Sequence, residues 1–284
     1  MGPELGLLYI VATPIGNLAD MVPRAVEVLQ CADLVAAEDT RHSQKLLSHF
    51  NIDSPLLAYH EHTDARRTGQ ILQRLEQGLT VALISDAGTP LISDPGYRLV
   101  RTARERGIRV VPIPGACAFI AALSAAGLPS DRFSFEGFLP AKGGARERAL
   151  RELARDTRTL IFYEAPHRVA DTLEAMAAVF GGEREAVIAR EVSKAFETFQ
   201  LMPLRQLASW VRADSNQQRG EIVVLVRGNE RRCESALDDE AQRVMSLLLA
   251  ELPPKKAAAV AAEITGVPKK VLYNWSLLRK KEGD

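Results

Sequence analysis

The stretch VALISDAGTP, residues 81–90, decides the fold class of this chain. Its first four residues are apolar and end abruptly in small, turn-forming residues, which is typical of a buried parallel strand that opens into a loop. Open α/β sheets bind their ligands at such strand ends. The apolar run 7–12 has the same form, because it ends in Thr13-Pro14-Ile15-Gly16-Asn17-Leu18. We expect the two strand ends to lie close together and to offer bare backbone to one small molecule.

Strand and helix patterns alternate along the first part of the chain, as in a parallel sheet with helices between its strands. The patterns predict strands at 7–12, 33–37, 79–84 and 108–112, and helices near 22–31, 40–50, 64–77, 93–106 and 116–126. A second α/β series follows, with strands at 133–138, 159–163, 186–190 and 221–226, a further strand at 197–201, and helices at 141–155 and 166–180. We expect this second sheet to be mixed.

Beyond Gly228 the pattern changes to three short helices, near 236–251, 254–265 and 268–280. The sequence therefore predicts an N-terminal α/β domain at 1–128, a second α/β domain at 129–228 and a helical appendage at 229–284. The last two helices resemble a helix-turn-helix, with Tyr273 and Trp275 on the second. The alternative is a helical hairpin that only packs on a neighbouring element.

Composition limits the classes of function. With 284 residues, 46% of them hydrophobic, the chain can bury sizeable cores. The 36 basic and 36 acidic residues cancel, which argues against coating nucleic acid by bulk charge. Residues 253–281, however, hold seven bases and one acid, enough to neutralise several phosphates or to form a solvated face. No run approaches the roughly 20 apolar residues of a membrane span, and no signal peptide is evident, so we expect a cytoplasmic protein with no membrane partner.

Common site motifs are absent from the sequence. The first strand is not followed by G-x-G-x-x-G, and Gly88-Thr89-Pro90 does not complete a phosphate loop, which argues against NAD and ATP. Cys31, Cys117 and Cys233 are too widely spaced for a disulfide framework or a zinc cluster. His60-Glu61-His62 lacks a third or fourth ligand, so we predict no metal site.

Seven short motifs together resemble the tetrapyrrole-methylase superfamily. They are Thr13–Leu18 (TPIGNL), Ala37–Arg41 (AEDTR), Tyr59–His62 (YHEH), Ser85–Pro90 (SDAGTP), Pro112–Gly115 (PIPG), Phe162–Arg168 (FYEAPHR) and Arg190–Lys194 (REVSK). In their order and in the helical tail that follows, they resemble the bacterial 16S ribosomal RNA (cytidine-2'-O)-methyltransferases of that superfamily.

The resemblance implies S-adenosylmethionine as methyl donor, bound in a folded conformation in a cleft between the two αβα domains of the chain. It also implies a homodimer. It implies as target the ribose of a cytidine in the decoding region of 16S ribosomal RNA, as free RNA or in the small ribosomal subunit. Carried over motif by motif, the donor-binding residues are Pro14 and Gly16 in the cleft, Asp86, Ala87 and Gly88 at the methionine part, Cys117 and Ala118 on the other side, and Tyr163, Ala165, Ile222 and Val223 around the adenosine. Cys117 stands where the superfamily leads us to expect a hydroxyl residue.

Methyl transfer to a ribose needs alignment of the hydroxyl oxygen, exclusion of water and a group that takes the proton. The candidates expected to face the cleft are Glu38, Asp39, Arg41, His60, Glu61, Glu191 and Lys194. Asp39 with Arg41, and Glu191 with Lys194, are alternatively simple ion pairs. As the base we favour His60, or Lys194 if burial lowers its pKa.

Two other functions share part of this pattern. A tetrapyrrole methyltransferase needs the same donor site but a large acidic macrocycle in the cleft. The basic tail and the arginines between 146 and 168 favour RNA, although porphyrin carboxylates also bind arginine. A helix-turn-helix regulator that senses a metabolite would bind a specific duplex and transfer no methyl group.

Overall fold

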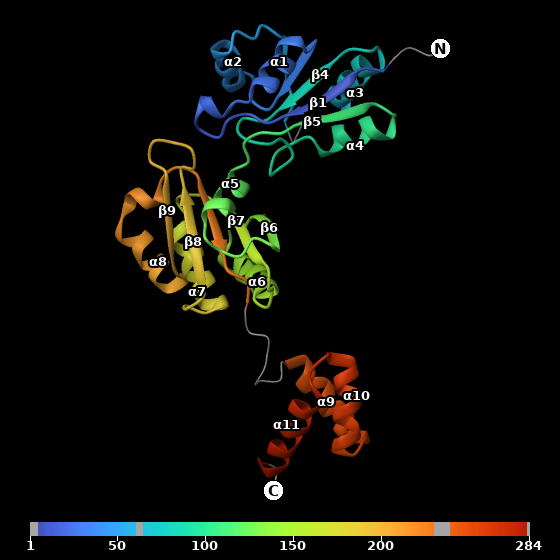
Figure 1. The fold of residues 1–284 in the computed structure, drawn as a ribbon, viewed down its shortest axis with the longest axis vertical. Helices are drawn as coiled ribbons and strands as arrows, with labels where there is room; N and C mark the ends of the chain where they lie inside the picture. Colours follow the sequence, from blue (N-terminus) through green and yellow to red (C-terminus); the bar gives the residue numbers. More distant parts are fainter. Residues whose placement is uncertain (1–4, 61–64, 230–238, 283–284) are drawn as a thin grey trace. The chain divides into compact units, whose positions relative to one another are not determined.

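The computed structural model describes residues 5–60, 65–229 and 239–282. The chain forms two compact units, Met1–Gly228 and Asn229–Asp284. Figure 1 colours both along the sequence. The first unit contains two sheets of five strands each, and the second contains helices.

The first sheet is parallel throughout, in the order β3-β2-β4-β1-β5. Its strands are β1 (Leu7–Val11), β2 (Leu34–Ala37), β3 (Leu56–Ala58), β4 (Val81–Ile84) and β5 (Arg109–Ile113). Every residue of β2 and β4 is buried, as expected for strands covered on both faces. The order reverses between β1 and β4, so a crevice is expected at the carboxyl ends of these two neighbours.

Helices cover both faces of this sheet. They are α1 (Pro23–Cys31) and α2 (Thr40–His49) on one face, and α3 (Ala65–Glu76) and α4 (Tyr97–Glu105) on the other. A short 3-10 turn, η1 (Leu18–Asp20), precedes α1. The two apolar cores pack the helices onto both faces of the sheet. The loops at the carboxyl ends of its strands lie outside these cores, where a site can form.

The second sheet is mixed, in the order β6-β7-β10-β8-β9. Its strands are β6 (Phe133–Phe138), β7 (Thr159–Glu164), β8 (Glu185–Arg190), β9 (Thr198–Pro203) and β10 (Ile222–Val226). Only β6 and β7 run parallel, and the other three pairs are antiparallel. The expectation of a mixed sheet is therefore confirmed.

One face of the second sheet packs against α6 (Gly143–Leu153), α7 (Val169–Phe180) and α8 (Leu204–Ala213) (Figure 1). A short 3-10 turn, η2 (Ser215–Gln218), follows α8 in the chain. The opposite face packs against α5 (Ala118–Ala125), through Phe119 and Leu123. The helix that ends the first α/β series thus contributes its apolar side chains to the core of the second sheet.

Three details differ from the sequence prediction. The helix expected at 93–106 begins at Tyr97, because the preceding loop holds Leu91 and Ser93 at positive φ (74° and 62°). Strand β3 was not predicted, since three residues give no usable period. Helix α8 was also not predicted, although its buried Leu204, Leu207, Ala208 and Val211 follow the helical period.

The second unit consists of α9 (Asp239–Glu251), α10 (Pro254–Thr265) and α11 (Lys269–Glu282) around a small alanine-rich core. Gly266, in the left-handed conformation at φ 71°, ends α10. Trp275 packs against this core, whereas Tyr273 is exposed. Of the two aromatic residues expected on the last helix, Tyr273 is the more exposed, and Trp275 is partly buried. None of the helices in the described part of the chain combines the length and apolar composition needed to cross a bilayer.

Phe162 is fully buried at the centre of the second sheet, at 0% exposure. We expect Phe162→Ala to reduce the free energy of unfolding by about 3–5 kcal/mol, because it removes buried apolar surface and leaves a cavity. Urea unfolding at equilibrium measures the change. Phe196→Ala is the matched control, since Phe196 is 73% exposed. Equal losses in the two variants would contradict this account of the core.

Candidate functional site

The loops after β1 and β4 are joined by their own backbones. Thr13 donates its amide to the carbonyl of Gly88 (2.9 Å), and Gly88 donates its amide to the carbonyl of Thr13 (3.0 Å). The Thr13 hydroxyl donates to the Ser85 carbonyl at 3.2 Å. The expectation that these strand ends lie close together is confirmed.

Two glycines in these loops allow close approach. Gly88 has φ +84°, and a Cβ there would lie 3.3 Å from Cγ2 of Ile15 and 3.6 Å from the carbonyl oxygen of Ala116. Gly16 has φ +150°, and a Cβ there would lie 2.2 Å from Cγ of Lys194. Gly88 therefore presents bare backbone, and Gly16 makes room for a side chain from the loop after β8.

A cavity of about 420 Å³ opens beside these loops, within the usual size range of ligand pockets. Nine of the eleven predicted donor-binding residues line it: Asp86, Ala87, Gly88, Cys117, Ala118, Tyr163, Ala165, Ile222 and Val223. The other two, Pro14 and Gly16, line a cavity of about 330 Å³. Both cavities are lined by Ile15, Asp86, Ala87 and Glu221, so they are neighbouring parts of one cleft.

The two cavities differ in charge. The larger one, which we call the acidic cavity, is lined by Glu38, Asp86, Asp94, Glu164 and Glu221, and its described lining contains no lysine, arginine or histidine. The smaller one, which we call the basic cavity, is lined by His42, Lys45 and Lys194 as well as Asp86 and Glu221. A cationic ligand group suits the first cavity, and an anionic group suits the second.

Aromatic side chains surround one side of the acidic cavity. Tyr163 lies 4.9 Å from Phe135 and 5.7 Å from Phe138 between ring centroids. Burial raises the pKa of the Tyr163 hydroxyl, and the neighbouring Cys117 adds to the shift. Burial also raises the pKa of the Cys117 thiol. Both groups therefore stay neutral near pH 7 and can pack against an uncharged part of a ligand.

Asp39 caps a helix. Its carboxylate accepts hydrogen bonds from the backbone amides of Arg41 (2.8 Å) and His42 (3.3 Å) at the start of α2. These backbone hydrogen bonds, chiefly the one from Arg41, lower the pKa of Asp39. The Asp39 amide in turn donates to Oδ1 of Asp86 at 3.0 Å. Asp39 thus holds the start of α2 and the Asp86 side chain in place beside the cleft. Its hydrogen bond with Arg41 comes from the backbone amide of Arg41 and not from the guanidinium group.

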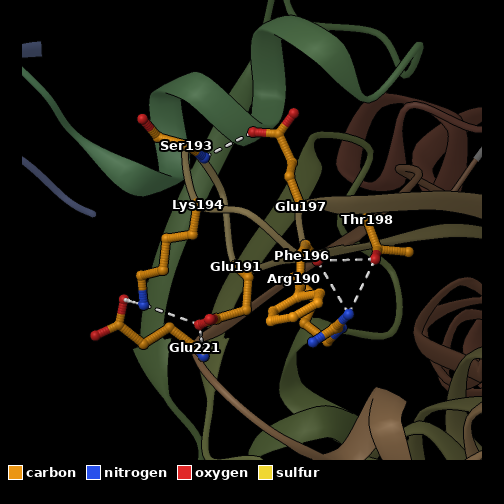
Figure 2. Close-up of polar contacts among 8 residues, drawn as sticks. All are labelled: Arg190, Glu191, Ser193, Lys194, Phe196, Glu197, Thr198 and Glu221. Atoms are coloured by element: carbon orange, nitrogen blue, oxygen red, sulfur yellow. Dashed lines mark hydrogen bonds and ion pairs between the residues drawn. The ribbon is translucent and has the colours of Figure 1, made fainter. Parts of the chain in front are cut away.

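Lys194 is held by two carboxylates (Figure 2). Its Nζ lies 2.8 Å from Oε1 of Glu191 and 2.9 Å from Oε2 of Glu221. Burial acts to lower the pKa of Lys194, but the hydrogen bonds to Glu191 and Glu221 outweigh it and raise the pKa. The structure thus contains the ion pair that was the alternative for Lys194 and Glu191, whereas a role of Lys194 as a base was tied to a lowered pKa.

The loop that carries Lys194 is closed by further contacts (Figure 2). Arg190, which is buried, donates to the carbonyl of Phe196 (3.0 Å) and to Oγ1 of Thr198 (3.1 Å). Ser193 donates its hydroxyl to Asp20, the last residue of η1. The loop therefore connects the second sheet to the first.

The remaining base candidate, His60, is exposed at the end of β3 and lines neither cavity. Glu61 and His62 lie outside the described residues, as does Cys233. Asp94 was not singled out in the sequence, yet it lines the acidic cavity. Asp94 follows the motif Ser85–Pro90 by only a few residues, which could have indicated that it lies at the site. It was missed because a helix was predicted to begin at residue 93.

The fold is that of a known class of methyltransferases. The family model of tetrapyrrole (corrin/porphyrin) methylases matches residues 7–208. Among solved structures, a cobalt precorrin-4 methyltransferase matches with a TM-score of 0.58 and 18% identity, over 78% of this chain and 94% of that one. Diphthine synthase matches with a TM-score of 0.58 and 15% identity, over 78% and 90%. At these identities the structures show a shared fold.

Curated relatives define the class more narrowly. Ribosomal RNA small subunit methyltransferase I of Pseudomonas aeruginosa is 62% identical over 97% of this chain and 98% of the relative. The protein of the same name from Escherichia coli O157:H7 is 56% identical over 96% and 95%. A model described as the RsmI C-terminal HTH domain matches residues 235–280. The chain belongs to the ribosomal RNA small subunit methyltransferase I family of tetrapyrrole methylases.

Gly88 tests whether the acidic cavity is a donor site. We expect Gly88→Val to abolish binding of S-adenosylmethionine, because φ +84° is strained for a β-branched residue and the side chain would enter the lining. Calorimetric titration of the folded variant measures this.

The matched control is Gly107→Val. Gly107 has φ +74°, but its Cβ would have only Leu5 nearby, at 3.9 Å. If Gly88→Val bound the donor with unchanged affinity, the loop would not belong to the site.

Proposed function

We propose that the protein transfers a methyl group from S-adenosylmethionine to the ribose 2'-oxygen of a cytidine in the decoding region of 16S ribosomal RNA. The observation that carries the proposal is the division of charge within one cleft. A donor with a sulfonium and an ammonium group suits the acidic cavity, and an RNA phosphate beside the target ribose suits the basic cavity. The names of the near full-length relatives supply the ribosomal substrate.

The residues present fit such a donor. Gly88 leaves a cradle that a Cβ would fill, and the carboxylates of the acidic cavity offset positive charge. Residues Asp86–Gly88 would hold the methionine part, and Tyr163, Ala165, Ile222 and Val223 would surround the adenosine. When bound, S-adenosylmethionine supplies an electrophilic methyl group. The chain has then to align the ribose oxygen, exclude water and accept a proton.

Lys194 has a positioning role in this proposal. Because its ammonium group is held by Glu191 and Glu221, it stays charged beside the basic cavity. Its aliphatic chain lies against Gly16 of the first domain. Arg41, which follows the Asp39 cap, and Glu191 would act in the same way, through the placement of neighbouring groups.

The alternatives have less support. A tetrapyrrole substrate would leave the helical tail without a role, and the curated relatives over nearly the whole chain carry a ribosomal name. A metabolite-sensing regulator has no need of the donor cleft. We include a homodimer and a cytoplasmic location in the proposal, on the family likeness that also gives the ribosomal substrate.

Direct transfer tests the proposal. The protein is incubated with labelled S-adenosylmethionine and small ribosomal subunits from cells that lack it, and the nucleosides are identified by mass spectrometry. We expect 2'-O-methylcytidine, and none in a reaction with subunits from cells that contain the protein. Labelled product at a base atom or on a uridine would contradict the proposal.

The second unit is proposed to hold RNA. Lys255 and Lys256 on α10, and Lys269 and Lys270 on α11, are all exposed. Each lysine–phosphate ion pair steepens the fall of log affinity with log salt by about 0.7 to 0.9, because it releases counterions from the RNA. A chain that ends at Gly228 should therefore bind the subunit more weakly and with a shallower slope. Its donor affinity should equal that of the full chain.

Filter binding over a salt series compares the two chains. Identical slopes would mean that the helices pack on a neighbouring element or on a second copy of the chain and do not hold RNA.

A further inference from the structure

Asp94 lies in the acidic cavity on the loop between β4 and α4. The cavity lining places it with Phe138 and Tyr163 of the second sheet, and its charge acts to raise the pKa of the Tyr163 hydroxyl. The neighbouring Ser93 also faces that sheet, because a Cβ on Gly137 would lie 3.9 Å from its hydroxyl oxygen. Asp94 therefore stands on the first-domain wall, opposite the aromatic side chains.

The backbone around Asp94 adopts costly conformations. Leu91 and Ser93 have φ 74° and 62°, which residues with a Cβ seldom adopt. Gly96 has φ +137°, and a Cβ there would lie 2.9 Å from Cδ2 of Leu83. Strained residues persist where the surrounding structure imposes them, and they cluster at functional sites. Here the strain lies on both sides of Asp94, the second of the two carboxylates, after Asp86, that this loop places in the cavity.

The other carboxylates of the acidic cavity are engaged by partners of their own. Glu164 accepts from Arg168, Thr172 and the Ala165 amide. Glu221 binds Lys194, and Asp86 accepts from the Asp39 amide. Glu38 also has an interaction partner. The group that acts to lower the pKa of Asp94 is the Ser85 hydroxyl, which is neutral and also lies 3.5 Å from the Ala87 carbonyl and 3.4 Å from the Gly88 carbonyl.

The environment of Asp94 favours proton uptake. Burial raises the pKa of its carboxyl group, the Ser85 hydrogen bond lowers it, and the charge of Asp86 raises it, with a net upward shift. The other titratable groups that line the cavity are Glu38, Asp86, Cys117, Tyr163, Glu164 and Glu221. None of them is cationic, so within the described lining the neutral Ser85 hydroxyl is the group that favours the ionised form of Asp94.

We propose that Asp94 is the catalytic residue that accepts the proton of the attacking ribose hydroxyl. This inference rests on the proposed function. In the transfer, the 2'-oxygen forms a bond to the methyl carbon while the carbon–sulfur bond breaks and its electron pair stays on sulfur as a neutral thioether. The hydroxyl proton passes to a carboxylate oxygen of Asp94 and later to water. His60 and Lys194 then have no part in the proton transfer.

Asp94→Asn tests the assignment, because the amide keeps the size of the side chain and cannot accept the proton. General-base catalysis contributes typically 10²–10⁴-fold, so we expect a loss of that order in single-turnover methylation of small subunits, measured from about pH 5 to about pH 9. The wild type should lose rate on the acid side as Asp94 takes up a proton, and this fall should be absent in Asp94→Asn. The affinity of Asp94→Asn for S-adenosylmethionine, measured by calorimetry, should stay within about threefold of the wild-type affinity.

Asp53→Asn is the matched control, since Asp53 is exposed in the loop before β3, at the opposite edge of the first sheet. Ser85→Ala is a second variant with a distinct readout. It removes the hydrogen bond that lowers the pKa of Asp94, so the acid limb of the rate should move to higher pH.

Each outcome bears on the assignment. An acid limb and rate within about threefold of the wild type in Asp94→Asn would overturn it, since a lost base costs far more. So would a loss of donor affinity as large as the loss of rate, which would make Asp94 a donor-binding residue. If the wild type itself methylated no subunit, the proposed function would fail together with the inference. Wild-type turnover with an unaffected Asp94→Asn would overturn the inference alone.

Discussion

The pair of backbone hydrogen bonds between Thr13 and Gly88 is the constraint on which the cleft depends. It joins the carboxyl ends of β1 and β4, the two strands between which the order of the first sheet reverses. The pair satisfies the backbone amide and carbonyl groups of Thr13 and Gly88, and buried backbone groups are costly to leave unpaired. Gly88 makes the pair possible at φ +84°, and the wall beside it is therefore bare backbone. The larger cavity, the placement of Asp86 and the path of the chain toward Asp94 all start from this point.

The second sheet is attached near the same place by a different interaction. Lys194, on the loop after β8, lies over Gly16, where a Cβ would be 2.2 Å from its Cγ. Ser193 on the same loop reaches Asp20. Gly16 was expected from the sequence to line the cleft, and it does line the basic cavity. The packing of Lys194 against Gly16 restricts this position more strongly, because any larger residue would collide with the lysine side chain. Gly16 therefore both lines the cleft and allows the two sheets to approach each other.

The strands of both sheets could be predicted because the signal is local. Runs such as 81–84 are apolar throughout and end in small residues, and the structure places β4 there. The three residues of β3 are too few for a period, so only pairing with β2 defines them. Helix α8 had a readable period and could have been predicted. The late start of α4 could not, because Leu91 and Ser93 have positive φ, which their residue types rarely adopt and therefore do not signal.

The charge of the cleft shows why the site was only partly predictable. The net charge of zero averages over residues that the fold separates by sign. The carboxylates of the acidic cavity come from positions 38, 86, 94, 164 and 221, so no window of sequence contains them. Burial acts to lower the pKa of Lys194, but hydrogen bonds to Glu191 and to Glu221, which is 27 positions away, together outweigh it. Because Asp86 and Ala87 line both cavities, a cationic donor and an anionic acceptor could each meet charge of opposite sign while their reacting atoms stay adjacent.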